Sequence, residues 1–297
     1  MIIRKANEAD IPAIVELLRL SLGEGLIKKS EEAWRWKHIE NPFGESPVLV
    51  AEEGGQLIGV RAMMQWSFEL NGRIYRAVRA VDTATHPEHQ GKGVFKKLTL
   101  TLIDQLTAEG YDFIFNTPNA QSKPGYLKMG WNEIYNVPIR IKPKLLFGKQ
   151  LAITEYEINE ATWLKLNEAE ETYVHWRYKN NPLAKYYQLS FDNGFAFFRI
   201  KEGKYFNELR ICDIYAKGNF AKPFKKALHY AMNSFRARLA SVGHYQGTYR
   251  QVLGKAGFLP KMDRGLSLTA RSLNTNPEDY FLQKSQIDLE LGTFELF

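Results

Sequence analysis

A seven-residue segment near the N-terminus recurs in the second half of the chain, and this recurrence constrains the fold more than any other feature. Trp36–Pro42 reads Trp-Lys-His-Ile-Glu-Asn-Pro, and Trp176–Pro182 reads Trp-Arg-Tyr-Lys-Asn-Asn-Pro. Three further landmarks recur in the same order: Arg79–Asp82 with Arg210–Asp213, Phe95–Leu98 with Phe224–Ala227, and Lys128–Trp131 with Lys255–Phe258. Ordered self-similarity of this kind predicts two homologous domains in tandem.

Runs of β-branched and aromatic residues follow both copies of the segment and predict strands. In the first half these runs are Val48–Glu52, Gln56–Met64 and Trp66–Leu70, and in the second half they are Tyr187–Phe191, Phe195–Lys201 and Tyr205–Tyr215. Breakers without sustained alternation begin at Ile141, so we expect a linker near residues 141 to 155.

A glycine-containing loop, His86–Phe95, lies between a predicted strand and a predicted helix. Arg79–Thr85 alternates as a half-buried strand does, and Lys96–Leu106 carries apolar residues at helical spacing. Gly91 and Gly93 allow a sharp turn, and the free amides at a helix start attract negative charge. The loop therefore predicts a site for an anion such as pyrophosphate, with an ordinary strand-to-helix turn as the alternative.

The segments after this helix make the pattern more specific. A short apolar strand is predicted at Tyr111–Phe115, and Asn119, Tyr126 and Gly130-Trp131 follow it. Gln90-x-x-Gly93 at a helix start, followed by this order, resembles the Gcn5-related N-acetyltransferase (GNAT) superfamily. Phe95 departs from the family pattern, because Gly or Ala is usual at its position.

The resemblance implies a fold class, a domain division and a cofactor. We expect an α/β (α+β) fold with tandem GNAT-like domains, each a mixed, mostly antiparallel central sheet flanked by helices. Residues 1–145 would form the acetyl-CoA-binding acetyltransferase domain and residues 146–297 a degenerate copy. The activity implied is acetyl-CoA-dependent N-acetyl transfer to a primary amine of a small-molecule acceptor, for example an amino sugar or a cell-envelope precursor.

The resemblance also assigns site residues. The residues expected to bind the cofactor are Ala84 and Thr85 at the strand edge, Gln90, Gly91, Lys92, Gly93, Val94 and Phe95 in the loop, and Asn119 beyond it. Tyr126 matches the family tyrosine that protonates the departing thiolate, although packing would also explain an aromatic residue there. Asn119 would also be explained as a helix cap.

The general base is less well defined by the sequence. Asp82 lies on the strand before the loop, where its carboxylate could accept the amine proton. Its counterpart Asp213 stands in the copy that lacks Gln-x-x-Gly, and this favours a structural role for both. His86 and His89 are two further candidates for the base. Both would also be explained as solvated surface histidines without a catalytic role.

The second copy has lost the chemistry of the first. Twelve residues separate Asp82 from Phe95, but only ten separate Asp213 from Phe224, and Leu253 stands where the first half has Tyr126. We therefore expect a single coenzyme A site and a structural or substrate-shaping second domain.

Composition sets outer limits on the function. The chain has 297 residues, of which 44% are apolar, enough for two packed cores. Its net charge of +7 suits an anionic ligand, but the basic residues are spread out, so no nucleic-acid partner is expected. We expect a cytoplasmic protein without a membrane span, a buried and unpaired Cys212, and no metal site.

Two other functions remain open from the sequence. One is a non-catalytic module that senses acyl-CoA, and the other is an acyltransferase that uses aminoacyl-tRNA. The intact Gln90-x-x-Gly93 argues against the second. The sequence leaves the acceptor and the oligomeric state open.

Overall fold

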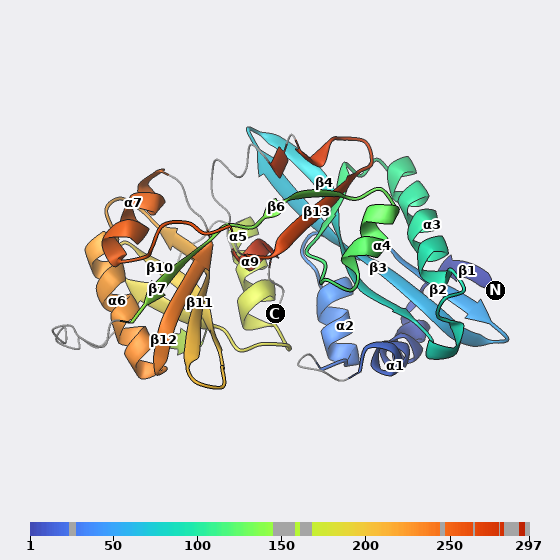
Figure 1. The fold of residues 1–297 in the computed structure, drawn as a ribbon, viewed down its shortest axis with the longest axis horizontal. Coiled ribbons are helices and arrows are strands. Elements are labelled where there is room, and N and C mark those ends of the chain that lie inside the picture. Colours follow the sequence, from blue (N-terminus) through green and yellow to red (C-terminus); the bar gives the residue numbers. More distant parts are fainter. Residues whose placement is uncertain are drawn as a thin grey trace. The chain divides into compact units, whose positions relative to one another are not determined.

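The structure is a computed structural model that describes residues 1–23, 28–144, 158–160, 168–243, 247–263, 265–278, 280–281 and 291–294. The chain forms two compact units. Unit 1 comprises Met1–Ile134 with Ser267–Leu282, and unit 2 comprises Tyr135–Leu266 with Gln283–Phe297. Each unit is built on one sheet with helices against it (Figure 1), which confirms the predicted fold class of two tandem α/β domains.

The sheet of unit 1 has seven strands in the order β1-β2-β3-β4-β5-β13-β6. Their bounds are β1 (Ile2–Lys5), β2 (Val48–Glu53), β3 (Gln56–Leu70), β4 (Arg73–Thr85), β5 (Phe113–Asn116), β6 (Asn132–Asn136) and β13 (Ser267–Ser272). β4 and β5 run parallel, whereas the pairs β1–β2, β2–β3, β3–β4 and β5–β13 are antiparallel. The two strands predicted within Gln56–Leu70 are one continuous strand.

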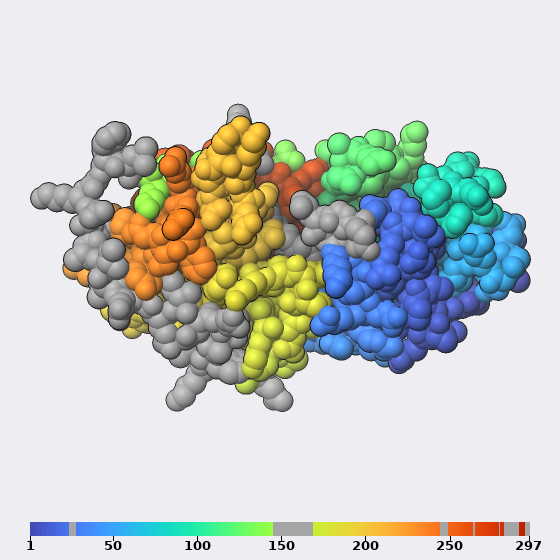
Figure 2. Space-filling model, turned by 90° about the horizontal axis from the view of Figure 1, so that it is seen from below, coloured from blue at the N-terminus to red at the C-terminus, as the bar shows by residue number. Residues whose placement is uncertain are grey.

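Helices cover both faces of this sheet (Figure 1). α3 (Val94–Ala108) and α4 (Lys123–Lys128) lie on one face, and α1 (Ile11–Leu22) and α2 (Glu31–His38) lie on the other. Alternation along β3 sends Val60 into the core under α1, and sends Met63 into the core under α3 and α4. The outer surfaces of α1 and α2 are the blue region of Figure 2.

The sheet of unit 2 has six strands in the order β7-β12-β11-β10-β9-β8. Their bounds are β7 (Ile139–Pro143), β8 (Ile158–Glu160), β9 (Tyr187–Phe191), β10 (Gly194–Lys201), β11 (Asn207–Ala216) and β12 (Ala237–Gly243). Here β11 and β12 are the parallel pair, as β4 and β5 are in unit 1. The two sheets therefore repeat the same strand order around the same parallel pair.

Helices of unit 2 also repeat those of unit 1. α6 (Ala221–Ser234) and α7 (Gly247–Ala256) follow β11 and β12 along the chain, and α6 packs on a core that includes Phe224 and Leu228. α5 (Glu168–Val174) continues into a π-helical turn, His175–Lys179, which contributes Tyr178 to a second core with Cys212. Cys212 is buried, as the sequence predicted, and as the single cysteine of the chain it forms no disulfide within the chain. The short helix α9 (Leu291–Phe294) also belongs to unit 2.

Each repeat contributes one strand to the sheet that is built mainly from the other repeat. β7 follows α4 and β6 along the chain but pairs antiparallel with β12. β13 follows α7 but pairs antiparallel with β5. Each compact unit is therefore discontinuous in sequence.

This exchange alters the expected linker. Ile141–Pro143, which the sequence assigned to the linker, belongs to strand β7, and the predicted linker residues after Lys144 lie outside the described residues. The boundary between residues 145 and 146 falls on that segment as well, so the division into 1–145 and 146–297 stays a prediction.

Candidate active site

The predicted anion loop connects β4 to α3. Gly91 and Gly93 have φ values of 74° and 78°, the left-handed region that glycine adopts without strain. A Cβ added to either glycine would meet no described atom within 4 Å. Gly93 is the N-cap of α3 and has no side chain that could cap the helix. The first amides of α3 are therefore open to an anion, and the loop fits a pyrophosphate group.

β4 separates from β5 just before this loop. The pairing of β4 with β5 covers Ala77–Arg79 and Phe113–Phe115, whereas its pairing with β3 continues to Thr85. In the described part of the chain, the backbone from Ala80 to Thr85 thus has one edge without a strand partner. An extended ligand that carries amide groups could bind along such an edge.

Ala84 and Thr85 lie at the end of this edge. Ala84 is buried in the core under α1, so only its backbone could serve a ligand. The Thr85 carbonyl accepts hydrogen bonds from Gln90 Nε2 at 3.3 Å and from Ser21 Oγ at 3.0 Å. The Gln90 side chain therefore fastens the loop to the strand, while Lys92 is exposed beside it.

Tyr126 lies on α4 and is 4% exposed. Its hydroxyl oxygen accepts a hydrogen bond from Arg61 Nη1 at 3.0 Å. Arg61 lies on β3 and is fully buried. The sequence analysis missed Arg61, although a single charged residue inside the apolar run Ile58–Met64 is itself a signal for a buried cation.

Phe95, the residue that departs from the family pattern, packs against this pair. Its ring meets the Tyr126 ring edge to face, with centroids 5.9 Å apart, and the Arg61 guanidinium lies 5.7 Å from its centroid. A Cβ added to Gly125 of α4 would lie 3.6 Å from the same ring. The larger side chain therefore fills the space between α3 and α4. Val94, the neighbouring loop residue, is buried in the same core.

Asp82 occupies a β-bulge in β4. Arg61 pairs with Thr83 and Ala62 with Val81, so Asp82 is the extra residue, and its φ is 36°. Its Oδ2 accepts hydrogen bonds from Lys37 Nζ at 2.7 Å and from His38 Nε2 at 2.9 Å. These donors come from α2, so the bulge ties α2 to β4.

The charged and polar groups around Asp82 favour its ionised form. Burial opposes the charge of Asp82, but Lys37 and His38 outweigh it and hold the pKa of the Asp82 carboxyl well below its usual range. Burial lowers the pKa of His38, against the pull of Asp82. A neutral His38 donates from Nε2 to Asp82, and its Nδ1 accepts from Ser46 Oγ at 2.9 Å. A carboxylate with these two partners is a weak proton acceptor.

The other candidates have local partners. Asn119 Oδ1 accepts from the backbone nitrogen of Ser122 at 2.9 Å and from that of Gln121 at 3.1 Å, so it caps the turn before α4. His89 Nδ1 lies 3.3 Å from Glu53 Oε2, and His86 Nδ1 accepts from the backbone nitrogen of Glu88. Asn119 and His86 thus stabilise their own loops, and His89 ties its loop to Glu53 at the end of β2.

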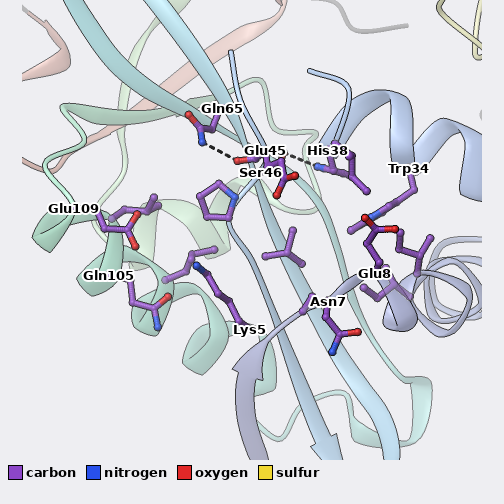
Figure 3. A pocket seen from close by; sticks show the side chains of 18 of the residues that line it. Lys5, Asn7, Glu8, Trp34, His38, Glu45, Ser46, Gln65, Gln105 and Glu109 are labelled. Carbon is purple, nitrogen blue, oxygen red and sulfur yellow. Dashed lines mark hydrogen bonds between the residues drawn. The ribbon is translucent and has the colours of Figure 1, made fainter. Parts of the chain in front are cut away.

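A pocket of about 300 Å³ lies at the sheet edge near the start of β2. Trp34, His38 and Glu8 line one side, and Gln105 of α3 and its C-cap residue Glu109 line the other (Figure 3). This pocket meets the C-terminal half of α3, whereas the glycine loop meets its N-terminus. The two features are therefore separate.

Two features are absent from the described residues. No group of three or more His, Cys, Asp or Glu side chains among them is arranged to hold a metal ion. None of the helices in the described part of the chain is long and apolar enough to cross a membrane.

Comparison with known proteins supports the assignment of the first unit. A family model described as an acetyltransferase (GNAT) domain matches residues 2–134. An L-methionine sulfoximine/L-methionine sulfone acetyltransferase from Salmonella typhimurium is 32% identical over 164 residues, which cover 52% of this chain and 91% of that protein.

Two solved structures share the fold of the whole chain. A probable N-acyltransferase from Enterococcus faecalis superposes with a TM-score of 0.66 at 11% identity, covering 92% of this chain and 73% of that one. A tandem GNAT protein from the clavulanic acid biosynthesis pathway gives a TM-score of 0.54 at 11% identity, covering 93% and 99%.

Proposed function

Because this chain belongs to the GNAT family of N-acetyltransferases, we propose that it transfers an acetyl group from acetyl-CoA to the primary amine of a small acceptor. The proposal rests mainly on the separation of β4 from β5 before the glycine loop. There the open strand edge from Ala80 to Thr85 leads directly to the uncapped start of α3. One continuous surface thus offers backbone groups for an extended arm and amides for a pyrophosphate.

Each part of the site has a task in direct transfer. Amides between Gln90 and Phe95 would hold the pyrophosphate, and the β4 edge at Ala84 and Thr85 would align the pantetheine arm. The acceptor nitrogen attacks the thioester carbon, the carbon–sulfur bond breaks, and Tyr126 would donate its proton to the sulfur. Asn119 would serve indirectly, by fixing the turn from which α4 presents Tyr126.

Asp82 fits a structural task better than that of a base. Both of its hydrogen bonds to α2 use Oδ2, and its lowered pKa weakens it as a proton acceptor. It would instead hold α2 against the bulge of β4 beside the acyl group. The amine would then lose its proton to solvent or to a group of its own binding site.

The relatives guide the choice of acceptors to test. The Salmonella protein is named for amino-acid analogues, so L-methionine sulfone and L-methionine sulfoximine are the first amines to test, with glucosamine as the amino-sugar arm. Thiol release from acetyl-CoA is followed with and without each amine, and the acetylated product is identified by mass.

The assay has a defined result. We expect thiol release that depends on an amine, and a fall in kcat of about a hundredfold on Tyr126→Phe with coenzyme A binding retained. Release that never exceeds the amine-free background, over amino acids, amino sugars and peptides, would refute the proposal.

A further inference from the structure

We infer that Arg61 is a positioning residue that holds the hydroxyl of Tyr126 for proton donation to the leaving thiolate. The inference rests on the proposed role of Tyr126 as general acid. Arg61 Nη1 donates to the Tyr126 oxygen at 3.0 Å, and both side chains are buried. The contact joins β3 to α4 across the core that lies behind the glycine loop.

The direction of this hydrogen bond leaves the tyrosine proton available. A guanidinium has donors only, so Arg61 occupies a lone pair of the phenol oxygen. The Tyr126 O–H is then free to point at a different acceptor. A phenol that accepts a hydrogen bond at its oxygen can still donate its own proton, because that proton is not used in the hydrogen bond with Arg61.

The charge of Arg61 has no counter-charge in the described part of the chain. Its Nη2 lies 3.6 Å from Met63 Sδ, its Nε has no hydrogen-bond partner among the described atoms, and its guanidinium lies 5.4 Å from the Tyr126 ring centroid. A buried cation without an ion pair costs free energy. Negative charge that develops on the Tyr126 oxygen or on the sulfur of the leaving thiolate would offset this cost.

The step balances without a further reactant. The nitrogen of the neutral amine forms a bond to the thioester carbon, and the electron pair of the broken carbon–sulfur bond goes to sulfur. Tyr126 gives its proton to that sulfur, and Arg61 stabilises the phenolate that remains. The product nitrogen releases one proton to solvent, and Tyr126 regains one from solvent.

Phe95 gives the arrangement its rigidity. Its ring lies against both the Tyr126 ring and the Arg61 guanidinium, with distances to the centroid of 5.9 and 5.7 Å. The rings of Phe95 and Tyr126 near the guanidinium limit the rotamers that Arg61 can adopt and partly compensate its charge. The residue that departs from the family pattern therefore belongs to the same cluster.

A double-mutant cycle on kcat tests the inference. The four proteins are the wild type, Arg61→Met, Tyr126→Phe and the double variant, assayed for acetyl transfer to the best amine of the panel. When Tyr126 is present, we expect Arg61→Met to lower kcat by about tenfold or more, the order of magnitude expected for the partner of a general acid. In the Tyr126→Phe background the same change should lower kcat by less than about threefold, because the two residues act together. The Kd for coenzyme A should stay within threefold of the wild type, on the order of the precision of such comparisons.

Two results overturn the inference while acetyl transfer itself stands. One is an equal loss of kcat in both backgrounds, which marks Arg61 as a packing residue. The other is an active wild type whose kcat changes with neither Arg61→Met nor Tyr126→Phe. Complete absence of transfer by the wild type refutes the proposed function and this inference together.

A second variant protects the test against misfolding. If Arg61→Met lowers the melting temperature too far for assay, Arg61→Gln enters the same cycle, because it removes the charge but keeps a polar, shorter side chain with a neutral donor. The two outcomes above decide the inference in the same way. Arg61→Lys, which restores the cation, should recover part of the lost kcat.

Discussion

His38 donates from Nε2 to Asp82 Oδ2 at 2.9 Å, and the second unit repeats this contact with Tyr178, which donates to Asp213 Oδ2. His38 and Tyr178 occupy the same place in the duplicated segment, as do Asp82 and Asp213 in the later landmark. The pKa values of the two aspartates nevertheless shift in opposite directions. Lys37 and His38 hold the pKa of Asp82 low, whereas burial raises the pKa of Asp213 to about 6 against the effects of Tyr178 and Arg177.

The Asp82 cluster should be strongly coupled. Asp82→Asn removes the ion pair between the buried Lys37 ammonium and Asp82, and Lys37→Met removes one of the two described donors to Asp82 Oδ2, so that His38 remains. We expect each change to cost about 3 kcal/mol in the free energy of unfolding, and the double variant to cost clearly less than the sum. Urea unfolding at pH 7 measures all four proteins. Additive losses would contradict an ion pair that holds α2.

The same cluster has a defined pH dependence. Because its pKa is lowered in the folded state, Asp82 contributes stability that is complete above about pH 4 and is lost as pH falls through the folded-state value. The difference in unfolding free energy between wild type and Asp82→Asn should therefore stay constant, at about 3 kcal/mol, from about pH 5 to about pH 8. It should shrink only in acid. A difference that shrinks near pH 7 would show that Asp82 is not the group responsible.

Asp213 should show the opposite behaviour. Its raised pKa means that the folded state keeps a proton which the unfolded state has lost, so stability falls as pH rises from about 4 to about 6. The predicted loss is about 3 kcal/mol, from the shift of the pKa to about 6. Asp213→Asn keeps an acceptor for Tyr178 but cannot ionise, and should remove this loss. Thermal unfolding at pH 4, 5, 6 and 7 provides the comparison.

The segment Ser267–Leu282, which contains β13, should be essential to unit 1. Phe281 is fully buried and packs edge to face against Phe113 of β5, with centroids 5.4 Å apart. Phe281→Ala should cost about 3 to 5 kcal/mol. Tyr205→Ala is the control, because Tyr205 is 80% exposed and its loss should stay within about 0.5 kcal/mol. Equal effects of the two changes on the urea midpoint would show that the segment does not stabilise unit 1.

The sequence predicted what depends on local pattern. Strands β2 to β5 and β9 to β11, the glycine loop at the start of α3, and the order of the duplicated landmarks follow from spacing and residue type. The pairing of β13 with β5 could not be predicted in this way, because a strand's periodicity specifies its buried face but not its neighbour.

The partners of the site residues were also hidden. Lys37 and His38 stand within the duplicated segment, and their meeting with Asp82 depends on how α2 packs on β4. Arg61 appears in the sequence as one charge within an apolar strand, and only the packing of α4 on β3 brings it to Tyr126.

The central claim is that the loop before α3 binds coenzyme A, and a matched pair of glycines tests it directly. Gly93 precedes α3 and Gly218 precedes α6, both have positive φ, and a Cβ at either would meet no described atom within 4 Å. Asp at either position adds similar backbone strain, but only Gly93→Asp would place a carboxylate where the pyrophosphate binds.

Titration calorimetry with coenzyme A gives the answer. We expect one molecule bound per chain by the wild type and by Gly218→Asp, and a loss of affinity of at least a hundredfold in Gly93→Asp, on the order of about 3 kcal/mol. Unchanged affinity in Gly93→Asp, or an equal loss in Gly218→Asp, would contradict the assignment of the site.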